Sequence, residues 1–300
     1  HLKAILDEDE GEIRLYEPMR KHTTMNVGGP AQFWIEPTTV AGLARIVRHC
    51  ADAGTPLRIV GRGSNLLVRD GGIPGVVVNP VRGEFSEIHA DGDTIRAGAG
   101  VKFKALASAA QSAGLGDFEW MEGIPGAVGG SLRMNAGAMG WETFDQVVSV
   151  RMIDAEGEVF EKPVEEIRHH YRHVPELAHN VAVSAVFRGT PALDHEISEK
   201  MEASKTKRKS SQPVAASAGC IFKNPEGIGA GQLVDEMGLK ESGVGGAIVS
   251  EVHGNFIVNK AGATARDILD LIAEIKKVAL EKRGVELETE VQIIGQNEPI

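Results

Sequence analysis

One thiol stands among residues that could take part in chemistry on an anionic molecule. Cys220 follows Gly219 and is followed closely by Lys223 and Asn224. The glycine lets another molecule approach the backbone, and the lysine and amide side chains can hold a negative group. The alternative is a small buried hydrophobic residue, because free cysteine is among the most buried residue types. This stretch alone leaves both readings open.

Two glycine-rich segments could bind phosphate or a flat ring. Residues 61–66 follow an expected strand, and glycines there let backbone N–H groups converge on a phosphate. The segment lacks the third glycine of a dinucleotide fingerprint, which Leu66 replaces, and the Gly-Lys-Ser/Thr ending of a P-loop. Residues 123–130 add compact apolar side chains that could close against an aromatic ring. The pair predicts one large dinucleotide, and the alternative is that these glycines merely permit close packing.

Several cations could meet a diphosphate or a carboxylate. Lys205, Lys207, Arg208 and Lys209 precede the thiol, and we expect one or two of them to contact a ligand. The others would be solvated and would complement a helix dipole. Arg172 carries the planar fork that suits a carboxylate, although a surface arginine would be unremarkable. The adjacent histidines at 169–173 lack the spacing and partners of a metal site, so no metal is expected.

Apolar periodicity predicts the elements that position these groups in the first two thirds of the chain. Thr38 and Thr39 can cap a helix with Val40, Leu43, Ile46, Val47 and Cys50 on its inner face. A buried strand is expected at 57–60, another strand at 76–78, and a helix over 102–113. A hairpin over 147–153 and 158–161 and a half-buried strand over 181–187 give this part an α+β character.

A charged helix over 194–209 marks a boundary, after which a third part begins. It is predicted to hold a short helix near 232–237, strands at 247–249 and 256–258, and a helix over 264–283 between Thr264 and Gly284. A last strand over 285–293 alternates apolar residues with Glu286, Glu288, Glu290 and Gln292. This acidic face is ordinarily solvated, but if it faced Cys220 one carboxylate would be an acid or an anchor.

The composition limits the class of partner. The chain has 300 residues, 42% of them hydrophobic, and a net charge of -10, which argues against nucleic acid and anionic membranes. No apolar run approaches the roughly 20 residues that would span a bilayer, and no signal peptide is evident at the N-terminus. We expect a cytoplasmic monomer whose two cysteines, Cys50 and Cys220, are reduced.

An ordered set of motifs resembles the UDP-N-acetylenolpyruvoylglucosamine reductase family, flavoenzymes of bacterial cell-wall precursor synthesis. The matching segments are residues 23–31, 61–67, 123–130 with 135–137, 171–172, 217–225, 255–259 and 287–295. Each segment is weak alone, but the ordered set is highly specific.

The resemblance implies a three-domain α+β protein with the vanillyl-alcohol-oxidase type of FAD fold. We expect FAD-binding parts at 1–80 and 81–200 and a substrate-binding part at 201–300, whose extreme C-terminus can return to the first part. It also implies that NADPH reduces non-covalent FAD, which then passes hydride to the enolpyruvyl ether of UDP-N-acetylglucosamine. No histidine or cysteine lies in 61–66, where relatives of this flavin fold often attach the flavin covalently.

The resemblance also implies roles for individual residues. Arg172 and Glu290 would hold and polarise the substrate carboxylate, and Cys220 would donate the proton. The expected FAD-binding residues are Gly61, Arg62, Gly63, Ser64, Asn65, Leu66, Gly123, Ile124, Pro125, Gly126, Ala127, Gly129, Gly130, Asn135 and Gly137. The expected substrate-binding residues are Tyr171, Arg208, Lys209, Lys223 and Asn224.

Cys220 departs from the commoner family pattern, which has serine at this position. A thiol with its ordinary pKa of about 8.5 is protonated at neutral pH and gives up its proton more readily than an alcohol. Oxidation of the thiol would remove the acid. The chain also resembles the shorter family subtype, because it has no long insertion after Tyr171-Arg172 and no tyrosine beyond it. Two alternatives are another flavin enzyme of the same fold and a nucleotide-sugar-binding protein without redox activity.

Overall fold

The computed structural model describes residue 6 and residues 10–300, which form two compact units. The first unit contains the described residues up to 15, residues 33–62 and residues 75–207. The second contains residues 16–32, 63–74 and 208–300. Helices and strands are mixed throughout both units, which confirms the predicted α+β class. The division into three domains expected from the sequence stays a prediction.

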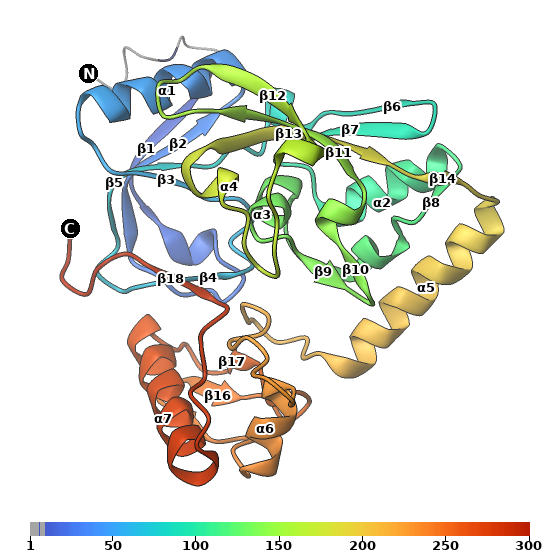
Figure 1. The fold of residues 1–300 in the computed structure, drawn as a ribbon. Helices are drawn as coiled ribbons and strands as arrows, with labels where there is room; N and C mark the ends of the chain where they lie inside the picture. The colour runs from blue at the N-terminus through green and yellow to red at the C-terminus, as the bar shows by residue number, and fades with distance from the viewer. Residues whose placement is uncertain (1–5, 7–9) are drawn as a thin grey trace. The chain divides into compact units, whose positions relative to one another are not determined.

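A four-stranded sheet lies at the start of the chain (Figure 1). Its strands, in spatial order, are β1 (Gly11–Pro18), β2 (Pro30–Pro37), β5 (Ile73–Val78) and β3 (Leu57–Ile59). Helix α1 (Val40–Asp52) is capped by Thr39, whose hydroxyl accepts a hydrogen bond from the Gly42 amide. Its predicted apolar face packs against strand residues such as Ile35 and Val78, and Cys50 is a core residue.

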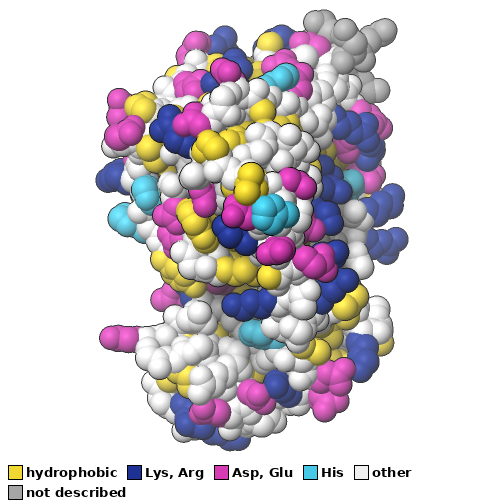
Figure 2. Space-filling model, turned by 90° about the vertical axis from the view of Figure 1, so that its right-hand side faces the viewer, with side chains coloured by type: hydrophobic (Ala, Val, Ile, Leu, Met, Phe, Trp, Pro, Cys, Tyr) yellow, Lys and Arg dark blue, Asp and Glu magenta, His cyan; other side chains and the backbone are white. Residues whose placement is uncertain are grey.

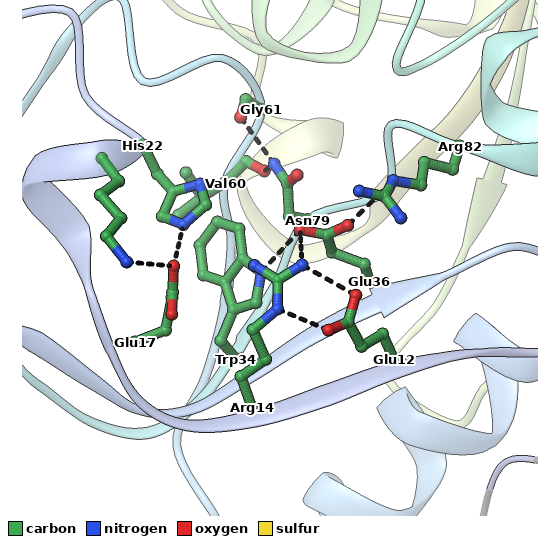
Figure 3. A network of polar contacts seen from close by, with 11 residues as sticks. Glu12, Arg14, Glu17, His22, Trp34, Glu36, Val60, Gly61, Asn79 and Arg82 are labelled. Atoms are coloured by element: carbon green, nitrogen blue, oxygen red, sulfur yellow. Dashed lines mark hydrogen bonds and ion pairs between the residues drawn. The ribbon is translucent and has the colours of Figure 1, made fainter.

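A buried carboxylate ties this sheet to the chain that follows it. Glu36 is 5% exposed and would be costly as an isolated charge. Trp34 Nε1 donates to its Oε1 at 2.9 Å, Arg14 lies 3.3 Å from the same oxygen, and Arg82 Nε lies 3.0 Å from Oε2 (Figure 3). Two cations and a donor therefore compensate the buried charge.

The second core of the first unit lies on an antiparallel five-stranded sheet. Its order is β12 (Val159–Pro163), β11 (Val147–Ile153), β13 (Val181–Arg188), β7 (Thr94–Gly98) and β6 (Ile88–Asp91). Helices α2 (Phe103–Ser112) and α3 (Val128–Arg133) contribute to its core. The predicted hairpin is confirmed, since β11 and β12 pair antiparallel.

Short elements connect these layers. Single 3-10 turns lie at Gly83–Ser86, Glu119–Gly123, Thr143–Asp145 and Val164–Glu166, and a fifth, Met19–Lys21, belongs to the second unit. The remaining short elements of the first unit are α4 (Glu176–His179), β8 (Leu115–Gly116), β9 (Gly137–Ala138), β10 (Trp141–Glu142) and β14 (Thr190–Pro191). The charged helix is confirmed as α5 (Asp194–Ser211).

The second unit packs helices against a small antiparallel sheet. The sheet has the order β15 (Gly243–Val244), β16 (Ala247–Val249) and β17 (Ile257–Asn259), and its helices are α6 (Ala230–Glu236) and α7 (Ala265–Arg283). Thr264 and Asp267 form a reciprocal capping box at the start of α7, and Gly284 ends it with a φ of 65°. Strand β4 (Leu66–Val68) pairs in parallel with β18 (Gln292–Ile294).

Two predicted strands differ from the structure. Residues 57–60 do not form a wholly buried strand, because β3 is the last strand of its sheet and Arg58 and Ile59 are exposed. The long strand over 285–293 is wrong, since only residues 292–294 join a ladder. Residues 288–290 instead make scattered backbone hydrogen bonds to residues 221 and 223. The alternation of burial that prompted the prediction holds for Glu286, Leu287 and Glu288 without a regular strand.

The surface carries side chains of every class. Figure 2 shows acidic, basic and apolar side chains interspersed over one face. None of the helices in the described part of the chain is long and apolar enough to cross a membrane.

Candidate functional site

The carbonyls at the start of the glycine loop are fixed by a buried amide. Asn79 directly follows β5 and is 6% exposed. Its Nδ2 donates to the carbonyl of Val60 at 2.6 Å and to that of Gly61 at 2.7 Å (Figure 3). Apart from its two chain neighbours, no atom of the described residues lies within 4 Å of the position that a Cβ would take at Gly61. The loop therefore turns these carbonyls inward and leaves space on its other side at Gly61.

The following residues are anchored in the same way within the second unit. The Thr24 amide donates to the Gly63 carbonyl at 3.2 Å, and the Gln292 amide donates to the Asn65 carbonyl at 3.0 Å. Gly63 has a φ of 62°, and a Cβ there would lie 2.0 Å from the His22 carbonyl, so only glycine fits. In a trans peptide the N–H points away from the carbonyl of the preceding residue. Each anchored carbonyl thus directs the N–H group of the next residue, Arg62 or Ser64, away from the group that binds that carbonyl.

Part of the second glycine-rich segment is held by hydrogen bonds and close packing within the fold. The amides of Val128 and Gly129 donate to the carbonyls of Val101 and Ala99, at 2.9 and 2.8 Å. A Cβ at Gly129 would lie 3.0 Å from the Ala99 Cβ. By contrast, Gly130 is exposed and has nothing within 4 Å of a Cβ position. Gly129 is therefore explained by packing, whereas Gly130 leaves room for another group.

Asn135 joins this segment to the predicted carboxylate-binding arginine. It is fully buried, and its Nδ2 donates to Glu142 Oε2 at 2.7 Å and to the His170 carbonyl at 3.3 Å. Its own carbonyl accepts from Arg172 Nη1 at 3.4 Å. The side chain of Asn135 thus holds the fold of the first unit, and its backbone contacts Arg172.

Tyr171 and Arg172 lie at the tip of a tight turn. The backbones of His170 and His173 exchange two hydrogen bonds, at 2.8 and 3.1 Å, which close the turn. Arg172 has a φ of 58°, and its guanidinium lies 4.6 Å from the centroid of the Tyr171 ring. Backbone strain of this kind is common where a side chain is presented for function.

In the second unit, consecutive hydrogen bonds join two predicted site residues, Asn65 and Glu290, to the residue that follows Cys220. Asn65 Nδ2 donates to the Glu290 carbonyl at 3.1 Å, and the Glu290 amide donates to the carbonyl of Ile221 at 2.8 Å. Ile221 directly follows Cys220, which is half-buried and forms no disulfide. The glycine loop, the acidic segment and the thiol segment therefore meet in one place, although they are far apart in sequence.

The polar residues after the thiol have partners within the protein. Lys223 Nζ lies 3.0 Å from Glu288 Oε2, and a hydrogen bond from Lys223 lowers the pKa of the Glu288 carboxyl. Asn224 Oδ1 accepts from the Ala230 amide at 3.0 Å, at the start of α6. Asn224 thus has a structural role as a cap, and its contact with a ligand stays a prediction.

One of the four predicted cations lies near the thiol. Burial lowers the pKa of the Arg208 guanidinium, and electrostatic interaction with Cys220 opposes this change. Arg208 is half-buried, whereas Lys207 and Lys209 are exposed and Lys205 pairs with Glu202 at 3.0 Å. The electrostatic interaction with Cys220 makes Arg208 a candidate partner of the thiol.

Sequence reasoning missed two buried amides that hold the site segments. Asn79 anchors the glycine loop, and Asn255 bonds the backbone of residues 221 and 222. Each is a single polar residue at the end of an apolar run, a weak signal that periodicity alone does not separate from a turn. Among residues 6 and 10–300, no group of three or more His, Cys, Asp or Glu could hold a metal ion.

Comparisons with known proteins identify similar sequences along nearly the whole chain. Residues 31–162 match the family model described as "FAD binding domain", and residues 211–294 match "UDP-N-acetylenolpyruvoylglucosamine reductase, C-terminal domain". A reductase of that name from Azorhizobium caulinodans is 42% identical, with 98% of this chain and 95% of the relative covered. The one from Bacillus velezensis is 39% identical, with 99% and 98% covered.

A solved structure agrees with these matches. The crystal structure of UDP-N-acetylenolpyruvylglucosamine reductase from Thermus caldophilus superposes with a TM-score of 0.82 at 35% identity. The superposition covers 95% of this chain and 99% of that one. The α+β fold with an FAD-binding domain, which the motifs implied, is confirmed.

Proposed function

Because the chain belongs to the UDP-N-acetylenolpyruvoylglucosamine reductase family, we propose that it makes UDP-N-acetylmuramate, a peptidoglycan precursor. The substrate is the enolpyruvyl ether of UDP-N-acetylglucosamine, and the electrons come from NADPH through FAD. The observation that carries the proposal is the hydrogen-bonded connection of Asn65, Glu290 and the residue after Cys220. It joins a predicted cofactor residue, a predicted carboxylate-binding residue and a predicted acid within one unit.

The anchored glycine loop fits the diphosphate of FAD. The carbonyls of Gly61 and Gly63 are bound by Asn79 and Thr24, so the N–H group that follows each carbonyl points away from that partner, and these N–H groups would bind the phosphates. Gly130 has open space at its Cα and would lie against the same cofactor. When bound, FAD supplies the capacity to accept a hydride from NADPH and to deliver one to the substrate's methylene carbon.

The polar side chains then handle the negative charge and the proton. Arg172 binds the substrate carboxylate through its planar fork, as Glu290 helps to orient that group. As hydride reaches the methylene carbon, the adjacent carbon gains an electron pair, and the Cys220 Sγ–H gives its proton to that carbon. The thiolate left behind is stabilised by Arg208, the cation placed near the thiol. Solvent must return a proton to Cys220 before the next cycle.

Lys223, Asn224, Tyr171 and Lys209 would seat the nucleotide diphosphate and sugar. Lys223 would exchange its exposed partner Glu288 for phosphate at little cost, since surface ion pairs contribute only about 0–1 kcal/mol. We also propose that the protein acts as a cytoplasmic monomer, with FAD bound non-covalently.

A visible absorption spectrum of the purified protein saturated with FAD tests the proposal. We expect flavin absorption bands that NADPH bleaches rapidly. Denaturation should release the FAD from the protein. Protein that stays colourless would instead be a nucleotide-sugar-binding protein without redox activity. Flavin bands that NADPH fails to bleach would point to another flavin enzyme of the same fold.

A further inference from the structure

A buried amide in the second unit contacts the segment that follows the thiol. Asn255 is 2% exposed and lies two residues before β17. Its Nδ2 donates to the Phe222 carbonyl and its Oδ1 accepts from the Phe222 amide, both at 2.8 Å. Its backbone carbonyl accepts from the Ile221 amide at 2.9 Å. One residue therefore makes three hydrogen bonds to the two residues after Cys220.

The carboxamide does here what a neighbouring β-strand would do. It offers a donor and an acceptor to the same buried residue, so both backbone groups of Phe222 are satisfied without a ladder. An ionised aspartate would keep only the acceptor, and alanine would keep neither. A buried backbone group left without a partner costs about 1–3 kcal/mol, so the segment would shift to find another.

The opposite side of the same segment is bound by the acidic segment. The Ile221 carbonyl accepts from the amides of Glu290 and Val291, at 2.8 and 3.3 Å. The Lys223 amide donates to the Glu288 carbonyl at 2.9 Å. Residues 221–223 thus lie between Asn255 and residues 288–291, and their position sets that of Cys220 relative to Glu290.

His253 supports Asn255 in this geometry. The Asn255 amide donates to His253 Nδ1 at 3.1 Å, which requires that nitrogen to be unprotonated. Burial lowers the pKa of His253, as does the charge of Lys240, and both favour the neutral ring. The ring also packs edge-on against Phe256, with centroids 5.0 Å apart. The backbone of Asn255 is therefore held by a second buried group.

We propose that Asn255 is a positioning residue that holds the Cys220 thiol in line for proton transfer and keeps it in register with Glu290. The catalytic part of this proposal rests on the proposed function. Asn255 itself touches no reacting atom and acts through the backbone of residues 221 and 222.

The test compares Asn255→Ala and Asn255→Asp with Asn259→Ala. Asn259 lies in the same unit, and its side chain also makes two hydrogen bonds, from its Nδ2 to the Met25 carbonyl and from the Ala263 amide to its Oδ1. The Asn259 side chain bonds none of residues 220–223 in these contacts, so this control also removes two side-chain hydrogen bonds from the unit but leaves the bonds of the thiol segment in place.

Stopped-flow measurements on the FAD-loaded enzymes separate the two half-reactions. We expect both Asn255 variants to keep the rate of flavin reduction by NADPH and to lose about 10²-fold in reoxidation by the enolpyruvyl nucleotide, since a misplacement near 1 Å costs that much. Asn259→Ala should keep both rates. If reduction and reoxidation fall equally in the Asn255 variants, or if Asn259→Ala behaves like them, Asn255 has only a structural role.

Alkylation of Cys220 by iodoacetamide gives a readout that is independent of turnover. Thiol reactivity follows the local environment, so its rate in the FAD-loaded protein should change in both Asn255 variants and stay the same in Asn259→Ala. Cys50 is 2% exposed and serves as an internal marker, because its alkylation would report unfolding. Unchanged Cys220 reactivity in the Asn255 variants would overturn the proposal. If the nucleotide fails to reoxidise even the wild type, the proposed function is wrong, and alkylation alone decides whether Asn255 positions the thiol.

Discussion

Cys220 is the residue whose substitution separates proton transfer from hydride transfer. We expect Cys220→Ala to leave flavin reduction by NADPH intact and to slow reoxidation by substrate about 10²–10⁴-fold, the usual contribution of a general acid. Cys220→Ser should retain much of the rate, because a hydroxyl can donate a proton from the same position. Stopped-flow absorbance measures both steps. Equal losses in the two half-reactions would show that Cys220 is not the proton donor.

Glu290 differs from its acidic neighbours in what it contacts. Glu290 is half-buried and its backbone bonds Asn65 and Ile221, whereas Glu286 and Glu288 are exposed, and Glu288 pairs with Lys223. Because the proposed role belongs to the Glu290 carboxyl group, Glu290→Gln should slow reoxidation as Cys220→Ala does, while Glu286→Gln and Glu288→Gln stay within about threefold of wild type, as surface substitutions usually do. If Glu288→Gln instead abolishes reoxidation, the role assigned to Glu290 belongs to Glu288, two residues earlier.

At the scale of single residues, local sequence left Cys220 undecided between a core thiol and a site. The order of the motifs, and not the local pattern, singled out Cys220, Glu290 and Arg172. The structure adds that Cys220 is half-buried near Arg208, whereas Cys50 packs in a core as its helix pattern predicted. Residues 255–259 belong to the matching motifs, but the roles of Asn79 and Asn255 could not be found from sequence, because their partners are backbone groups 18 and 33 residues away.

The glycine loop depends on the side chain that anchors it. Asn79→Ala removes two buried hydrogen bonds to the carbonyls of Val60 and Gly61, and each is worth about 1 kcal/mol. If this loss of about 2 kcal/mol appears fully in cofactor binding, FAD affinity falls about 30-fold, since 1.4 kcal/mol corresponds to a factor of ten. Fluorescence of FAD released on dilution gives the affinity.

Val78→Ala provides the control for that loss. It removes core methyl groups from the adjacent position of β5 and makes no change to the loop bonds. Val78→Ala should destabilise the protein and keep its FAD affinity. An equal fall in FAD affinity in both variants would show that the loss of the loop hydrogen bonds does not cause the fall.

The capping box of α7 makes a pH-dependent contribution to stability. Hydrogen bonding to the Thr264 backbone lowers the pKa of Asp267 below its ordinary value of 3.8. A carboxyl whose pKa is lower in the folded state stabilises the protein above the unfolded pKa, and this contribution is lost as pH falls through the folded pKa. Asp267→Asn keeps an acceptor oxygen but loses the charge, so it should cost about 0.3–1 kcal/mol at pH 7, the usual effect of an acidic charge in the first turn of a helix.

Urea unfolding of wild type and Asp267→Asn at pH 7 and near pH 3 measures this contribution. The difference in free energy of unfolding between the two proteins should be largest at pH 7 and should shrink as the wild-type Asp267 carboxyl becomes protonated. A difference that grows on acidification would contradict the assigned cause.

Elements with local signals were predictable, and those set by distant contacts were not. Helix α7 was predicted to within a residue because Thr264 and Gly284 mark its ends. The strand over 285–293 was wrong because residues 288–290 bond residues 221 and 223, a pairing that alternation cannot reveal. Strand β3 was expected to be buried, but its place at the edge of a sheet exposes Ile59. Sheet order is a tertiary property that a short apolar run does not encode.

For the molecule as a whole, FAD should act as a folding ligand. A ligand that binds only the native state stabilises it by about 2.7 kcal/mol at 100 times its Kd. We expect the midpoint of thermal unfolding to rise with added FAD, and that of Asn79→Ala to rise less at the same FAD concentration. Calorimetric scans with and without FAD measure the shift. Equal shifts in both proteins would contradict the role given to the loop.

The two units are each built from segments that are not continuous in sequence. The second unit draws residues 16–32 and 63–74 from the first quarter of the chain, and β18 pairs with β4. Apolar periodicity correctly indicated an α+β chain, but no sequence pattern showed that these distant segments belong to one unit. The ordered motifs supplied the fold family where periodicity could not.

The most direct test mixes the NADPH-reduced, FAD-loaded protein with the enolpyruvyl ether of UDP-N-acetylglucosamine under anaerobic conditions in deuterated water. We expect the oxidised flavin spectrum to return at once, with UDP-N-acetylmuramate as product and one deuterium on the carbon next to its carboxylate. A reduced spectrum that persists with the nucleotide and returns to the oxidised form only when oxygen is admitted would contradict the proposed function.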